Sequence, residues 1–204
     1  MNVLIEGLPK TVKVNGSPFL IRTEFYIAMI FVELMSDRYL TPYEKIMQAI
    51  KLWYIETPPI KTNKEILDAF NAIMWFYTMG ESEEEKKQQS QTVNRIRESN
   101  NRILDYEADQ AYIVSAYQQQ YNIDLTVENI HWWRFKMLFN GLTDKTKIVK
   151  IMQYRSMTID PKMPENQKKF YQEMKQLYAL PDNRTEEEKE RDFQDQLNIA
   201  LGGG

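Results

Sequence analysis

Three capping boxes constrain the fold of this chain more than any other sequence feature. In a capping box, a Ser or Thr and a Glu or Gln three residues later each bond the other's backbone N–H at the start of a helix. The boxes span Thr41–Glu44, Thr62–Glu65 and Thr185–Glu188. Pro42 occupies the first helical position of the first box, where its missing N–H costs no hydrogen bond. These signals predict a chain built mainly from helices.

Apolar residues spaced three and four apart predict further helices. One spans Phe25–Met35 with Thr23 as its N-cap, and Pro58 ends the helix of the first box. Gly80 is expected at the C′ position of the helix of the second box. In the second half we expect helices at about 107–121, at 127–141 with Thr126 as N-cap, at 144–155, and at 165–178 with Phe170, Met174, Leu177 and Tyr178 facing the core.

The N-terminal residues carry a β-hairpin pattern instead. Val12–Val14 and Phe19–Ile21 flank Asn15-Gly16, a dipeptide that tolerates the positive φ of a tight turn. Pro18 cannot donate a ladder hydrogen bond, so it must lie on a sheet edge. The predicted fold class is therefore mainly α, a multi-helix bundle with a short N-terminal β-hairpin.

A polar stretch in the middle of the chain separates these elements into two groups. Residues 81–90 include no apolar residue, which is typical of a linker or of an exposed helix start. We therefore predict an N-terminal unit at 1–80 with the hairpin and three helices, a polar linker or exposed helix start at 81–100, and a helical domain at 101–180. Residues 181–204 are expected to form a terminal amphipathic helix and a glycine tail.

The composition restricts the compartment and the classes of partner. The chain has 204 residues, of which 43% are hydrophobic, so it can bury a core. It has no Cys, which excludes disulfides and thiolate zinc sites. The first residues lack a signal-peptide pattern, and no apolar run reaches the ~18 residues of a membrane span. With a net charge of −3, a cytoplasmic protein without membrane or nucleic-acid partners is expected.

Few residues are suited to catalysis. His131 is the only histidine, and its position in a predicted apolar helix suits a core or boundary residue. No glycine-rich phosphate-binding loop occurs. Asp105 and Asp109 share a predicted helix face, which would suit a hard metal ion or an acid–base pair, but acidic residues at a helix start also stabilise the helix dipole. We favour the structural interpretation and expect neither an enzyme nor a cofactor.

Two apolar segments are candidates for binding another protein. The helix around Trp132 is apolar on all sides, so it is either buried on several sides or shared with a partner. The predicted terminal helix has a narrow apolar stripe between charged flanks, which needs a groove of this chain or of a partner. The candidate partner-binding residues are Trp132, Trp133, Phe193, Leu197 and Leu201.

A basic cluster is the one pointer to nucleic acid. Lys145, Lys147, Lys150 and Arg155 lie close together in the sequence, with Tyr154 beside them. Four basic residues on one helix usually form a solvated surface, and the chain as a whole is acidic. Nucleic-acid binding by this helix is therefore kept only as an alternative.

Six short strings follow one another along the chain in a recognisable order. They are Ile21–Phe25, Trp75–Gly80 in the helix after Pro58-Pro59, Asp105–Asp109, Tyr121–Leu125, His131–Phe135 and Ile151–Arg155. In this order and spacing they resemble the bacteriophage gene-product-fifteen family of tailed phages that infect Gram-positive bacteria. The resemblance covers roughly residues 1–180, and it depends on the order because no single string is specific.

The resemblance implies a role in building a phage tail. Family members are typically encoded just before the tape measure protein, and proteins from that position look like tail assembly chaperones. The resemblance therefore implies binding to the tape measure protein and other tail assembly proteins in the host cell cytoplasm, with self-association left open. A structural tail or connector protein retained in the virion and a phage regulatory or nucleic-acid-binding protein are the alternatives. The resemblance assigns no catalytic residue to this chain.

Overall fold

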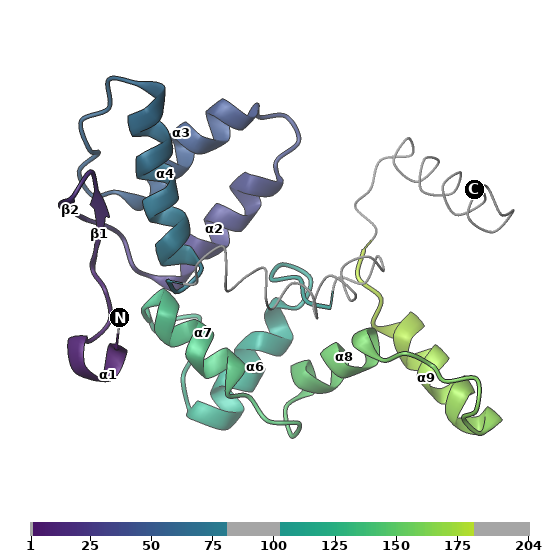
Figure 1. Ribbon diagram of the computed structural model, residues 1–204. Helices are drawn as coiled ribbons and strands as arrows, with labels where there is room; N and C mark the ends of the chain where they lie inside the picture. The colour runs from purple at the N-terminus through teal and green to yellow at the C-terminus, as the bar shows by residue number, and fades with distance from the viewer. Residues whose placement is uncertain (1, 81–102, 182–204) are drawn as a thin grey trace, which may run out of the picture.

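The computed structural model describes residues 2–80 and 103–181, which form helices and one two-stranded antiparallel sheet (Figure 1). The predicted fold class, mainly α with a short N-terminal hairpin, is confirmed. No helix within the described ranges is long and apolar enough to cross a membrane. The elements are α1 (Val3–Glu6), β1 (Thr11–Val14), β2 (Ser17–Leu20), α2 (Phe25–Ser36), α3 (Pro42–Trp53), α4 (Asn63–Tyr77), α6 (Gln110–Tyr121), α7 (Trp132–Asn140), α8 (Lys147–Ser156) and α9 (Glu165–Leu177).

The hairpin forms where the sequence predicts it. Asn15 and Gly16 have φ values of 50° and 81°, which is the left-handed conformation that a two-residue hairpin turn requires. Around this turn, Val14 pairs with Ser17. Alternate residues of β1 are buried, and β1 packs against α4, so the hairpin is joined to the helices.

The first two capping boxes start α3 and α4, as predicted. At α3, the Thr41 hydroxyl accepts from the Glu44 N–H at 3.3 Å, and the Glu44 carboxylate accepts from the Thr41 N–H at 2.8 Å. Thr62 and Glu65 form the same pair of bonds at α4. A hydrogen bond from the Thr41 side chain lowers the pKa of Glu44. The third box, Thr185–Glu188, lies outside the described residues.

Two helix starts differ from the prediction because distant residues determine them. The N-cap of α2 is Glu24, not Thr23, since the Thr23 carbonyl accepts from the Trp132 N–H at 2.6 Å and the chain is extended there. The helix predicted to follow Thr126 begins only at Trp132. Thr126 instead lies in a turn, in which its N–H and hydroxyl both donate to Asp124.

The end of α4 lies one residue earlier than predicted. Met79, with a φ of 62°, occupies the C′ position that was expected for Gly80, and its N–H donates to the Phe76 carbonyl at 3.1 Å. Gly80 follows it, and its N–H donates to the Trp75 carbonyl at 2.8 Å. Together these bonds satisfy the last carbonyls of the helix, as in a Schellman motif. The left-handed position is thus taken by a methionine whose side chain packs against the core.

Residues from both halves of the chain share one hydrophobic core. Helix α7 joins the halves, because the indole N–H of Trp132 donates to the Tyr77 carbonyl at 2.9 Å and that of Trp133 donates to the Phe76 carbonyl at 2.7 Å. α7 also packs on α2. The predicted linker lies outside the described residues, and the division into an N-terminal unit and a helical domain stays a prediction.

Helices α8 and α9 lie at the opposite side of the molecule from the hairpin (Figure 1). α8 packs on α6, and α9 packs on α8. We call these two helices the α8–α9 arm. None of the described side chains of α9 is buried, so this helix lies on the surface of the protein rather than within its core.

Candidate functional site

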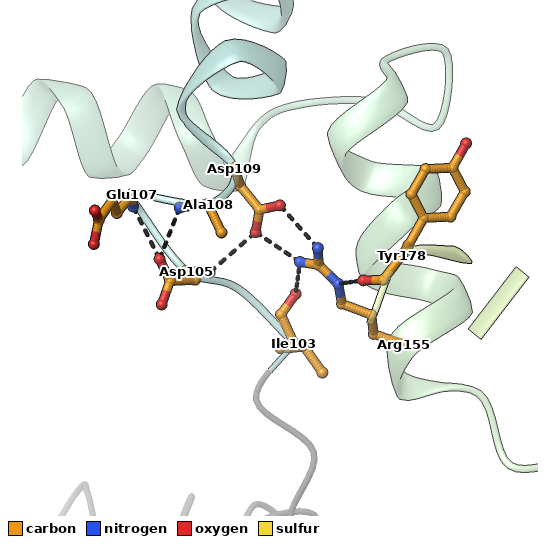
Figure 2. A network of polar contacts seen from close by, with 7 residues as sticks. All are labelled: Ile103, Asp105, Glu107, Ala108, Asp109, Arg155 and Tyr178. Atoms are coloured by element: carbon orange, nitrogen blue, oxygen red, sulfur yellow. Dashed lines mark hydrogen bonds and ion pairs between the residues drawn. The ribbon is translucent and has the colours of Figure 1, made fainter. Parts of the chain in front are cut away.

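A buried ion pair fixes the α8–α9 arm to the rest of the protein. Arg155, in the last turn of α8, donates from its two terminal nitrogens to the carboxylate of Asp109 at 2.6 and 2.9 Å (Figure 2). Asp109 is the N-cap of α6, and both side chains are almost fully buried. The planar guanidinium matches the carboxylate with two parallel bonds, which gives this contact both strength and a fixed orientation.

The same two side chains also bind backbone groups of neighbouring segments. Arg155 donates to the carbonyls of Ile103 at 3.1 Å and Tyr178 at 2.6 Å. The Asp109 carboxylate accepts from the Asp105 N–H at 3.0 Å. Removing one member of such a buried pair leaves the other charge without compensation, which typically costs about 3–5 kcal/mol. The ion pair therefore holds the residues before α6, the end of α8 and the end of α9 in one arrangement.

Asp105 and Asp109 have separate roles, which agrees with the structural interpretation of this pair. Asp105 stabilises the turn before α6 by accepting from the N–H groups of Glu107 and Ala108 at 3.0 and 2.9 Å. The carboxylate of Asp109 is bound to Arg155. Within residues 2–80 and 103–181, no three His, Asp or Glu side chains gather as metal ligands. Both aspartates thus take part in structural hydrogen bonds.

Lysine side chains hold α9 against α8. Lys175 donates to the carbonyls of Arg155 and Met157 at 3.1 and 2.7 Å, which satisfies carbonyl groups at the C-terminal end of α8. The Lys147 ammonium lies 5.7 Å from the ring centroid of Tyr178 and 4.9 Å from that of a tyrosine of α6. These contacts orient α9 without burying its apolar side chains.

The same contacts bear on the basic cluster at residues 145–155. Arg155 is buried in its ion pair, and Lys147 lies over two tyrosine rings. Of the four cations of the cluster, only Arg155 is buried, whereas Lys145, Lys147 and Lys150 are exposed. Nucleic-acid binding by this helix therefore stays an alternative with one cation fewer than the sequence suggested.

Helix α9 presents an apolar face that the described residues cover only in part. Phe170 and Leu177 are 45% and 65% exposed, and they lie seven residues apart on the same side of the helix. The sequence predicted both to face the core, which is wrong for Leu177, whereas Phe170 packs with part of its ring against α8. Tyr154 of α8 lies 6.1 Å from Phe170, 6.5 Å from Tyr171 and 6.1 Å from Tyr178 between ring centroids. α8 therefore covers part of Phe170, and Leu177 is the more exposed of the two side chains.

The five residues predicted to contact a partner fall into two groups. Trp132 and Trp133 are 0% and 2% exposed, and both indoles donate to carbonyls of α4, so they are core residues in this fold. A partner would reach them only if α7 moved. The other three lie outside the described residues: Phe193, Leu197 and Leu201. Partner binding by any of the five stays a prediction.

His131 is a neutral, fully bonded side chain at the start of α7. It is the N-cap rather than a residue within the helix, and its Nδ1 accepts from the Trp133 N–H at 3.1 Å. Its Nε2 lies 2.9 Å from the Pro9 carbonyl, so the proton of the neutral ring belongs on Nε2. Burial lowers the pKa of His131. The ring therefore links the chain before β1 to α7.

The chain matches a known protein family. The family described as Bacteriophage Gp15 protein matches residues 4–180, which include the hairpin and the helices from α2 to α9. No curated protein and no solved structure matches the chain.

Proposed function

The chain belongs to the bacteriophage Gp15 protein family, and on this premise we propose that it is a tail assembly chaperone that binds the tape measure protein. The family itself supports a structural or assembly role in the phage. As a chaperone, the protein acts in the host cell cytoplasm, where it keeps the long apolar helices of the tape measure soluble until other tail proteins replace it.

The exposed face of α9 is the observation that carries this proposal. Proteins that bind amphipathic helices offer apolar anchors along one line, with a spacing that matches helical turns. Phe170 and Leu177 are two such anchors, about 10 Å apart at 1.5 Å per residue. Most other side chains of α9 are charged or amides, and such a rim keeps a complex soluble.

The contacts beneath α9 support the same role. The Asp109–Arg155 ion pair and the bonds of Lys175 hold the helix in a defined position. A surface that is already ordered loses less conformational entropy when a partner binds. The arm can therefore offer its apolar face without first having to fold.

The residues predicted from the sequence remain further candidate contacts. The terminal stripe of Phe193, Leu197 and Leu201 has the spacing of a helix face, whereas Trp132 and Trp133 would require a movement of α7. Charged substitutions at Phe193 and Leu197 that left both folding and tape measure binding unchanged would remove the terminal stripe from the proposal.

Coexpression with a helical fragment of the tape measure protein tests the proposal. We expect the fragment to be soluble when this protein is present and to precipitate when it is absent, because the chaperone covers apolar surface that otherwise aggregates. Equal solubility with and without this protein would contradict the proposal.

The composition of the purified virion is a second test. A chaperone leaves the tail when assembly is complete, so mass spectrometry should not detect this chain at the level of a structural subunit. Detection at that level would favour the alternative, a structural tail or connector protein retained in the virion.

A further inference from the structure

Two extended segments, one before α2 and one before α7, meet at Glu24 and His131. These two residues lie opposite each other in an antiparallel bridge. The residues on either side of the pair form the backbone bonds of the bridge, from Phe25 to Ile130 at 2.9 Å and from Trp132 to Thr23 at 2.6 Å. In such a non-hydrogen-bonded pair the Cα atoms are only about 4.5 Å apart, and both side chains lie on the same face. The side chains of Glu24 and His131 are therefore close neighbours.

The carboxylate of Glu24 has a buried oxygen that accepts no hydrogen bond. Glu24 is the N-cap residue of α2, but its side chain makes no capping bond. Its Oε2 is shielded from solvent and accepts no hydrogen bond from residues 2–80 or 103–181. A buried carboxylate oxygen without a donor costs free energy, so a positively charged donor beside it is favoured. Glu24 can therefore accept one further hydrogen bond from a neighbouring group.

The groups around His131 favour opposite protonation states of its ring. Burial, the strongest influence, lowers the pKa of His131, and the charge of Lys10 acts in the same direction. The bond to the Pro9 carbonyl and the charge of Glu24 raise this pKa. From α4, the uncharged ring of Phe76 faces His131 at 5.5 Å between ring centroids. The ring is therefore neutral above its lowered pKa, and Glu24 is the neighbouring group whose charge stabilises the protonated form.

We propose that Glu24 and His131 form a proton switch at the start of α7. In the neutral ring, Nδ1 accepts from the Trp133 N–H at 3.1 Å and so caps the helix. Uptake of a proton places a hydrogen on Nδ1, and this nitrogen can then no longer accept. The imidazolium donates to the carboxylate of Glu24 instead, as a charge-assisted hydrogen bond. One proton thus exchanges the N-cap bond of α7 for an ion pair with the start of α2.

The switch acts on the helix that joins the two halves of the chain. Trp132 and Trp133 are the first two residues of α7, and their indoles donate to carbonyls of α4. Loss of the N-cap bond leaves one more N–H of the first turn without an acceptor, so this turn opens more readily. The switch is a property of the chain alone. Only its consequence for a partner, which would reach Trp132 and Trp133 once α7 loosens, rests on the proposed function.

Titration of the full chain from about pH 8 to about pH 5 by nuclear magnetic resonance tests the switch. His131 is the only histidine, so its imidazole ¹⁵N signals report its protonation without ambiguity. We expect the Trp133 amide signal to move with the same midpoint, below pH 6.5, because this N–H loses its acceptor. Glu24→Gln should lower the midpoint by about one pH unit, a tenfold loss of proton affinity. Glu33→Gln, the same charge change at an exposed position of α2, should leave it unchanged.

Further variants test the switch without relying on the folding of Glu24→Gln. Lys10 is exposed, and its charge opposes the proton on His131, so Lys10→Gln should raise the midpoint. His131→Asn keeps an N-capping side chain that does not titrate, so the Trp133 amide should then stay unchanged over the same pH range. The amide signal of Ile73, which is buried in α4, reports on the core and should persist throughout.

Three results would overturn the switch. Equal midpoints in the unchanged chain and in Glu24→Gln would show that Glu24 does not stabilise the imidazolium. A Trp133 amide that stays in place while His131 titrates would show that the N-cap bond persists. Loss of the Trp133 and Ile73 signals at the same pH would show that acid unfolds the whole protein rather than the start of α7. Because no tape measure protein is present, each result leaves the coexpression test of the proposed function unaffected.

Discussion

The core around α4 and α7 and helix α9 of the arm are held in place in different ways. In the core, large aromatic side chains are buried against one another, and Phe76 lies 5.4 Å from Trp53 and 5.8 Å from Trp133 between ring centroids. In the arm, α8 buries Ile148 and Ile151, but none of the described side chains of α9 is buried, and polar bonds of Arg155 and Lys175 hold this helix and its end to α8. The core thus depends on close apolar packing, whereas the position of α9 depends more on a few charged groups in fixed geometry.

Because of this difference, one part of the protein can supply stability while another part binds. A densely packed core opens only with the whole domain, whereas a segment with few buried contacts opens at a lower free energy. The core can therefore keep α4 and α7 rigid while α9 remains accessible to a partner. The comparison leads to four predictions.

The largest effect is expected for Phe76→Ala in the core. This side chain is completely buried, and replacing a buried Phe by Ala typically lowers the free energy of unfolding by about 3–5 kcal/mol. Urea denaturation measures the loss. Asn71→Ala, on the exposed side of the same helix, should change stability by less than about 0.5 kcal/mol. Similar small losses in both variants would contradict the role assigned to the core.

The next effect is expected for Asp109→Asn at the base of the arm. We expect a loss of about 3 kcal/mol, because the guanidinium of Arg155 would keep its burial without its counter-charge. Hydrogen exchange should show that α9 loses protection while α4 keeps it. Asp144→Asn, an exposed carboxylate before α8, is the matched control. Simultaneous loss of protection in α4 and α9 would show that core and arm do not differ as described.

A smaller, pH-dependent effect is expected from His131. Burial lowers its pKa in the folded protein below the ordinary value of 6.5, so the unfolded chain binds a proton more readily. Stability is therefore fully present above about pH 6.5 and falls as the pH decreases below it, by at most about 1.4 kcal/mol per pH unit. His131→Asn retains an N-capping side chain and should lose this dependence. Equal losses of stability between pH 7.5 and pH 5.5 in the unchanged protein and in His131→Asn would contradict this prediction.

The smallest effect is expected for Lys175→Met in the arm. This substitution removes two bonds to the end of α8, and a half-buried hydrogen-bonding group of this kind contributes about 1 kcal/mol. The loss should appear as faster hydrogen exchange in α9 alone. Lys169→Met, at an exposed position of the same helix, should leave exchange unchanged. If both variants behaved alike, the contacts of Lys175 would not be what orients α9.

The sequence predicted those parts of the fold that depend on local bonds. The capping boxes at Thr41 and Thr62 and the turn at Asn15-Gly16 involve residues at most four apart, so a short stretch of sequence contains all the information. The starts of α2 and α7 were missed because the Thr23 carbonyl is bonded to Trp132, more than one hundred residues away. A local pattern cannot reveal such a partner.

The candidate site was only partly predictable for the same reason. Asp109 and Arg155 both stood out in the sequence, one as an acidic and one as a basic candidate, but their pairing spans 46 residues. Phe170 and Leu177 were assigned to the core because spacing identifies the apolar side of a helix and not what covers it. The low apolar content of α9, four of its 13 residues, was the available signal of an exposed helix.

Photocrosslinking from α9 in the coexpressed complex tests most directly that this helix contacts the tape measure protein. A benzophenone amino acid at Leu177 reports on the apolar face, and the same group at Gln172, exposed on another side of α9, is the control. The proposal predicts strong crosslinks to the tape measure fragment from Leu177 and few from Gln172. A complex that forms normally, yet crosslinks equally from both positions or not at all from Leu177, would contradict it.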